Sequence, residues 1–103
     1  MEVISSDTNI WLDFNAISSI EFPFRLPVEY VMYREALERE LLSPPELAKD
    51  LQKLGLEGVE ITTEEFYYAE ELAEKYVKLS TYDRIALSIA KCRDIPLLTG
   101  IIF

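Results

Sequence analysis

The chain contains no histidine among its 103 residues. This absence excludes Ser-His and Cys-His nucleophile pairs, His-ligated zinc and histidine general bases. The three glycines (Gly55, Gly58 and Gly100) form no phosphate-binding cluster, which excludes a Walker loop and a GxGxxG motif. The single cysteine, Cys92, cannot form an internal disulfide, and such cysteine usage is typical of a reducing compartment.

Long hydrophobic runs are also absent. No apolar run approaches the ~18 residues of a membrane span, and Met1-Glu2-Val3 lacks the basic region of a signal peptide. Half of the residues are nevertheless apolar and 12% are aromatic, which is enough for a packed core. We therefore expect one soluble cytoplasmic domain over residues 1–103, with no membrane partner.

Carboxylates are what the chain has in quantity. Its 19 Asp and Glu residues oppose 10 Lys and Arg residues, which makes the net charge −9. Residues 29–74 alone carry 13 acidic and 4 basic side chains. The basic footprint of a nucleic-acid-binding surface is missing, so any nucleic-acid role must work through a metal ion or a local basic rim.

Short apolar strands alternate with amphipathic helices along the chain, and this pattern predicts an α/β fold. We expect a three-layer α/β/α arrangement with a short parallel sheet. The predicted strands cover residues 3–6, 30–32, 59–61 and 96–99, and helices cover 10–14, 35–42 and 46–54. Capping signatures at Thr62 and Ser80 open two further helices. Their predicted core stripes are Phe66, Ala69, Leu72, Ala73 and Tyr76 in the first, and Tyr82, Ile85, Ala86, Ile89 and Ala90 in the second.

Three acids can meet beyond the carboxyl ends of the strands, where ligands bind in an open parallel sheet. Asp7 follows the first strand, Glu40 lies on the helix after the second, and Asp83 lies in the first turn of a later helix. Grouped carboxylates repel one another unless a dication such as Mg²⁺ or Mn²⁺ lies between them. Structural roles are also open: Asp7 and Asp83 both occupy helix-capping positions, and Glu40 can be a solvated helix residue.

The same residues carry a resemblance to a known family. The segment VISSDTNIWLDF (residues 3–14) resembles the opening of PIN-domain proteins, whose first strand ends in Asp-Thr-Asn. The segment LSTYDRIALSIA (79–90) resembles the family's Leu-Ser-x-x-Asp helix, and LLTG (97–100) resembles its third landmark. The three landmarks occur in the family's order and at similar spacing.

The resemblance implies a PIN fold and a metal-dependent ribonuclease, as in the VapC-like toxins of toxin–antitoxin pairs. It implies that Asp7, Glu40 and Asp83 are the catalytic, metal-binding acids, with Glu38 and Glu35 as alternatives to Glu40. Asn9 and Thr99 match supporting positions. The implied cofactor is Mg²⁺ or Mn²⁺, and the implied partners are an RNA substrate and an antitoxin protein.

The chain departs from the family pattern after Gly100. Ile101-Ile102-Phe103 stands where the family continues with its fourth acid, a basic helix and a last strand. We therefore expect a C-terminally truncated PIN-like domain, and a homodimer that covers the exposed sheet edge. A catalytically inactive PIN-like interaction module is the alternative function. A receiver-like domain fits the topology but lacks the paired acids and the lysine of such sites.

Overall fold

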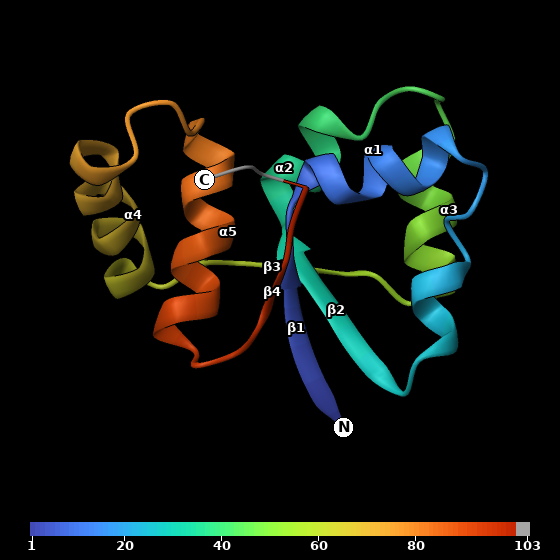
Figure 1. Ribbon diagram of the computed structural model, residues 1–103, viewed down its shortest axis with the longest axis horizontal. Helices are drawn as coiled ribbons and strands as arrows, with labels where there is room; N and C mark the ends of the chain where they lie inside the picture. Colours follow the sequence, from blue (N-terminus) through green and yellow to red (C-terminus); the bar gives the residue numbers. More distant parts are fainter. Residues whose placement is uncertain (101–103) are drawn as a thin grey trace.

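Four short strands form one parallel sheet in the computed structural model, which describes residues 1–100 (Figure 1). The sheet order is β3-β2-β1-β4, so β1 lies in the interior and pairs with β2 and with β4. The strands are β1 (Glu2–Ser6), β2 (Val28–Tyr33), β3 (Glu57–Val59) and β4 (Leu97–Leu98). The all-parallel pairing confirms the predicted α/β class.

Helices cover both faces of this sheet. Figure 1 shows α4 and α5 on one side, with α1 and α3 on the other. The helices are α1 (Thr8–Ala16), α2 (Arg34–Glu40), α3 (Leu47–Leu54), α4 (Thr63–Lys75) and α5 (Thr81–Cys92), and a 3₁₀ turn, η1, spans Phe22–Arg25. The three-layer arrangement predicted from the alternation of elements is therefore present.

The strand β2 divides the core because successive side chains of a strand point to opposite faces. Tyr30 and Met32 pack with Trp11 in the core beneath α1 and α3. Val31, between them, packs with residues of α4 and α5. Trp11 is fully buried; its ring stacks on Phe24 at a centroid distance of 5.2 Å.

Two expectations about local structure were wrong. The third strand lies at Glu57–Val59, two residues before the predicted 59–61. Its last residue, Val59, pairs with Tyr33, and β2 ends there, so the residues after Val59 have no strand partner. Phe66, predicted in the core, is 46% exposed. The buried stripe of α4 is rotated toward Glu65, whose side chain is held inward by an ion pair.

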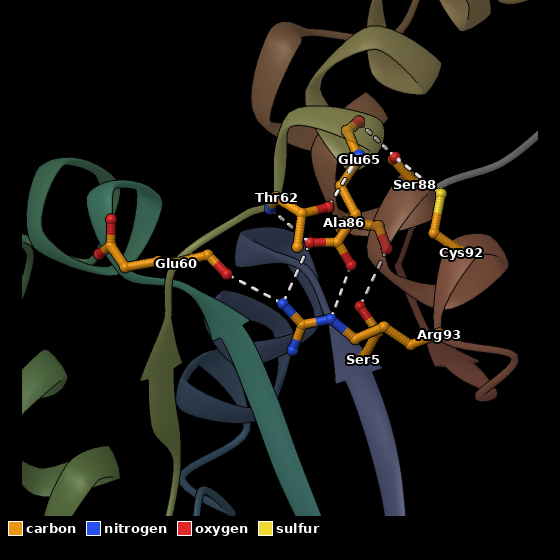
Figure 2. A network of polar contacts seen from close by, with 8 residues as sticks. All are labelled: Ser5, Glu60, Thr62, Glu65, Ala86, Ser88, Cys92 and Arg93. Atoms are coloured by element: carbon orange, nitrogen blue, oxygen red, sulfur yellow. Dashed lines mark hydrogen bonds and ion pairs between the residues drawn. The ribbon is translucent and has the colours of Figure 1, made fainter.

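That ion pair fastens α4 to α5 (Figure 2). Arg93 Nε donates to Glu65 Oε2 at 2.7 Å, and Arg93 Nη2 donates to the Glu60 carbonyl at 2.9 Å. The Ser88 hydroxyl donates to the Glu65 carbonyl at 2.6 Å. The Glu65 side chain is only 3% exposed, whereas that of Arg93 is 33% exposed.

The pKa of the Glu65 carboxyl reflects two opposed effects. Burial alone would raise this pKa because it disfavours the charged form. The hydrogen bonds and charge of Arg93, together with hydrogen bonds from Thr62, outweigh burial and hold the pKa below its ordinary value. The carboxylate is therefore charged in the folded chain, and its pair with Arg93 offsets much of the cost of burying that charge.

A reciprocal capping box starts α4, as its sequence predicts. Glu65 N–H donates to the Thr62 hydroxyl at 3.1 Å, and Thr62 N–H donates to Glu65 Oε1 at 2.9 Å. We expect Thr62→Ala to lower the free energy of unfolding by about 1 kcal/mol in urea titrations, because one cap is lost. Thr63→Ala is the matched control, since Thr63 is exposed and lies one position later. An equal loss in both variants would contradict a specific role of the Thr62 hydroxyl.

Candidate functional site

Asp7 lies where β1 ends and α1 begins, and it is only 2% exposed. Its Oδ1 accepts the Ile10 N–H at 2.8 Å, so it caps α1 as its position predicts. Its Oδ2 accepts the Thr99 hydroxyl from the end of β4. The structure thus brings together two predicted site residues that are 92 positions apart.

No cationic side chain within residues 1–100 forms an ion pair with Asp7. Its carboxylate therefore relies on the Ile10 amide and on a neutral hydroxyl. Buried charges in proteins are normally paired or coordinate a metal ion. This residue is accordingly the side chain in the predicted site whose environment most favours a cation.

The backbone around Asp7 is held by two buried serines at the end of β1. The Ser5 hydroxyl donates to the Ala86 carbonyl of α5, and the Ser6 hydroxyl donates to the Val31 carbonyl of β2, each at 2.9 Å. Trp11 Nε1 donates to the Ser6 hydroxyl at 3.0 Å. These bonds fix the start of α1 against β2 and α5, so the position of Asp7 is set by three elements.

Glu40 reaches the same region through Thr8, the residue after Asp7. The Thr8 hydroxyl donates to Glu40 Oε1 at 2.6 Å, and Glu40 is exposed at the end of α2. The alternatives are placed differently. Glu38 is exposed and makes no side-chain bond to the rest of residues 1–100, whereas Glu35 forms an i,i+4 ion pair with Arg39.

Glu35 also faces two tyrosines at this edge of the sheet. Burial raises the pKa of the Tyr33 and Tyr82 hydroxyls, and the nearby Glu35 raises both further. The two rings are 6.1 Å apart. Glu35 is paired with Arg39 and lies near the two tyrosines, whereas Glu40 is the acid of α2 that contacts the Asp7 segment through Thr8.

Asp83 occupies the predicted capping position at the start of α5. Its N–H donates to the Ser80 hydroxyl and its Oδ2 accepts the Ser80 N–H, both at 3.2 Å. The bond between Ser5 and Ala86 ties α5 to β1 one helical turn later. The start of α5 lies on the same side of the molecule as the carboxyl ends of the strands (Figure 1).

The three acids are not assembled into a metal cage. In the described part of the chain, no three Asp, Glu, Cys or His side chains form a group that could hold a metal ion. The donor chemistry still fits a hard dication, because Asp7 and Glu40 offer only oxygen and can be completed by waters. A site that includes Asp83 needs side chains to rotate on binding, and it stays a prediction.

Asp13 is a further acid near this site that the sequence reasoning missed. A Cβ placed on Gly100 would lie 2.7 Å from Asp13 Oδ2, so the end of the exposed Asp13 side chain lies against Gly100, the residue after Thr99. The same Cβ would lie 3.4 Å from the Asn9 Cβ, and Asn9 itself is exposed on α1. The i,i+4 spacing of Asn9 and Asp13 on one helix face was the available signal. The expected departure at residues 101–103 lies outside the described residues.

Comparisons with known proteins do not identify a family. No protein-family model matches the chain, and neither the curated proteins nor the solved structures include a significant match. No helix within residues 1–100 has the length and apolar content needed to cross a bilayer.

Proposed function

We propose that this chain is a PIN-like domain that cleaves RNA with the help of Mg²⁺ or Mn²⁺. The observation that carries the proposal is the buried carboxylate of Asp7, which has no cationic partner within residues 1–100 and is bound by Thr99. Asp7 and Thr99 belong to the first and third landmarks of the PIN resemblance. Their direct contact supports treating the landmarks as parts of one site.

In this proposal Asp7 and Glu40 hold the ion, and Asp83 joins them from the start of α5. Glu40 is preferred over Glu35 and Glu38 because the Thr8 hydroxyl links it to the Asp7 segment. The hydroxyls of Thr8 and Thr99 orient the two carboxylates and stabilise their charge in the ion-free chain. When a cation binds, its stronger attraction to the carboxylate oxygens can replace the hydrogen bonds from these two hydroxyls.

The chemistry of the reaction divides between ion and protein. A bound dication supplies a water of lowered pKa and stabilises negative charge on the phosphodiester. The chain positions the ligand. The Asp7 side chain is already held by the Ile10 amide of α1 and by Thr99 after β4, so it loses little conformational freedom when the ion binds. The net charge of −9 repels RNA at long range. A dication bound at the carboxyl ends of the strands would neutralise part of this negative charge and reduce the repulsion there.

Cleavage of single-stranded RNA tests the proposal directly. We expect the purified chain to cut a labelled RNA in Mg²⁺ or Mn²⁺, and EDTA to stop the reaction. Products are read on a denaturing gel, with a chain-free lane in the same metal as the control for spontaneous hydrolysis. Identical cutting with and without the protein would reject the enzymatic function.

A second candidate function is a non-catalytic PIN-like interaction module. The absence of an assembled three-acid group in residues 1–100 favours it. Mn²⁺ titration followed by calorimetry separates the two: saturable heat supports the nuclease, and no heat at millimolar metal supports the interaction module. An antitoxin protein is the partner that the resemblance implies, and a second copy of the chain is a further candidate partner for either function.

A further inference from the structure

Two neighbouring aromatic rings lie in solvent on the outward face of α4. Phe66 is 46% exposed and Tyr67 is 62% exposed, and their ring centroids are 5.7 Å apart in an edge-to-face arrangement. The opposite face of the helix is the one that packs in the core, through Ala69 and Leu72. Figure 1 shows α4 as the outermost element on its side of the molecule, with α5 between it and the sheet.

The side chains that surround the two rings are acidic. On a helix, residues three and four positions from Tyr67 are its surface neighbours, and these include Glu64, Glu70 and Glu71. Glu74 continues the row one turn later, and it repels Glu70 at i,i+4. Each of the four glutamates is exposed, and none forms an ion pair within the described residues.

Cations are scarce on this helix. Lys75 is its single basic residue, and its ammonium lies 5.3 Å from the centre of the Tyr76 ring. Glu65 is already paired with Arg93 and is buried, so it adds nothing to the outward face. Arg84 of α5 reaches α4 at the Ala69 carbonyl, 3.4 Å away, but no ion pair within residues 1–100 involves the row of glutamates. A complementary cationic surface would compensate these like charges.

The face is also anchored to the rest of the fold before any partner arrives. The capping box at Thr62 fixes the start of α4, and the bonds of Arg93 to Glu65 and to the Glu60 carbonyl hold it against the chain after α5. A preordered surface loses little conformational entropy when it binds. Rigid aromatic anchors ringed by polar groups are typical of the centres of protein interfaces.

We propose that the face formed by Glu64, Phe66, Tyr67, Glu70, Glu71 and Glu74 docks a cationic amphipathic helix of another protein. Its apolar residues would cover the two rings. Its Arg and Lys side chains would pair with the glutamates, and an Arg guanidinium would stack over the Tyr67 ring. RNA and a second copy of this face carry the wrong charge for the same surface. This inference is independent of the proposed nuclease function.

A labelled model peptide of Leu, Lys and Arg in helical heptad order tests the docking face, with fluorescence anisotropy as the readout. We expect saturable binding, and a loss of roughly tenfold in affinity for Tyr67→Ala. Phe22→Ala is the matched control, because Phe22 is similarly exposed at 60% and lies on η1. We expect it to change the affinity less than twofold. Amide chemical-shift changes should map to α4.

A second pair of variants separates this face from the overall acidity of the chain. Glu70→Gln with Glu74→Gln removes two charges from the face, and Glu38→Gln with Glu46→Gln removes two exposed charges elsewhere. We expect only the first pair to weaken binding and to reduce its dependence on salt. Equal losses for both pairs, or unchanged affinity for Tyr67→Ala, would overturn the proposal. Sedimentation showing a dimer that Tyr67→Ala dissolves would assign the face to self-association instead.

Discussion

Arg93→Ala is expected to lower the free energy of unfolding by about 2–4 kcal/mol, although Arg93 is a third exposed. The substitution leaves the Glu65 carboxylate charged and 3% exposed with no cation beside it. Breaking a fully buried pair costs about 3–5 kcal/mol, and solvent at the Arg93 end reduces this figure. The bond to the Glu60 carbonyl is lost as well. Urea titration at neutral pH measures the change.

Two further variants identify the cause. Arg34→Ala removes a pair with Glu60 in which both side chains are more than half exposed, and we expect it to cost less than about 1 kcal/mol. Adding Glu65→Gln to Arg93→Ala removes the buried charge, so the double variant should be more stable than Arg93→Ala alone. Similar losses in Arg93→Ala and Arg34→Ala would show that burial of Glu65 is not the cause.

The same pair makes stability depend on pH with a defined sign. The pKa of Glu65 in the folded chain lies below its ordinary 4.5, so the pair's contribution is complete above that pH. It is lost as the pH falls through the lowered pKa. Without Arg93, burial is opposed only by the hydrogen bonds with Thr62, so we expect the pKa of Glu65 to be higher in the variant than in the parent chain. The variant then loses less stability than the parent chain when Glu65 is protonated. The stability difference between them should therefore shrink on acidification; a constant difference would contradict this account.

Local sequence signals predicted most of the fold because each acts over a few residues. The capping boxes at Thr62 and Ser80 satisfy the first helical amides whatever the rest of the chain does, and both occur as predicted. Gly55 ends α3 with φ 126°, a backbone angle that favours glycine. The predicted buried face of α4 was wrong at Phe66 because it is set by the pair of Glu65 with Arg93, and these two residues are 28 positions apart. No local periodicity records such a pair.

The candidate site was predictable in part for the same reason. Asp7 at the end of the first strand follows from the rule that parallel sheets bind ligands beyond their carboxyl ends. Its bond to Thr99 and the bond of Thr8 to Glu40 depend on how β4 and α2 are placed against α1. Side-chain rotations of this kind are set by tertiary packing, so the sequence left open which of Glu35, Glu38 and Glu40 contacts the Asp7 segment.

Asp7→Asn should abolish metal-dependent RNA cleavage, lowering its rate by roughly a hundredfold or more, while the fold stays intact. Asparagine is as good a helix N-cap as aspartate, so its Oδ1 can keep the Ile10 amide bond. Its amide can donate to the Thr99 hydroxyl in place of accepting from it. The charge is removed, and with it the main attraction for a dication. Cleavage rate and Mn²⁺ binding heat are the two measurements.

Stability is the third measurement, and it separates a functional acid from a structural one. Asp7 is buried without a cationic partner in residues 1–100, so a variant that removes its charge and keeps its hydrogen bonds should not destabilise the ion-free chain. We expect Asp7→Asn to unfold at the same or higher urea concentration in EDTA, and to lose the stabilisation that Mn²⁺ gives the parent chain. Asp50→Asn, on the exposed side of α3, should leave cleavage, metal binding and stability unchanged. Full cleavage by Asp7→Asn would remove Asp7 from the reaction, and a large loss of stability in EDTA would make it a structural residue.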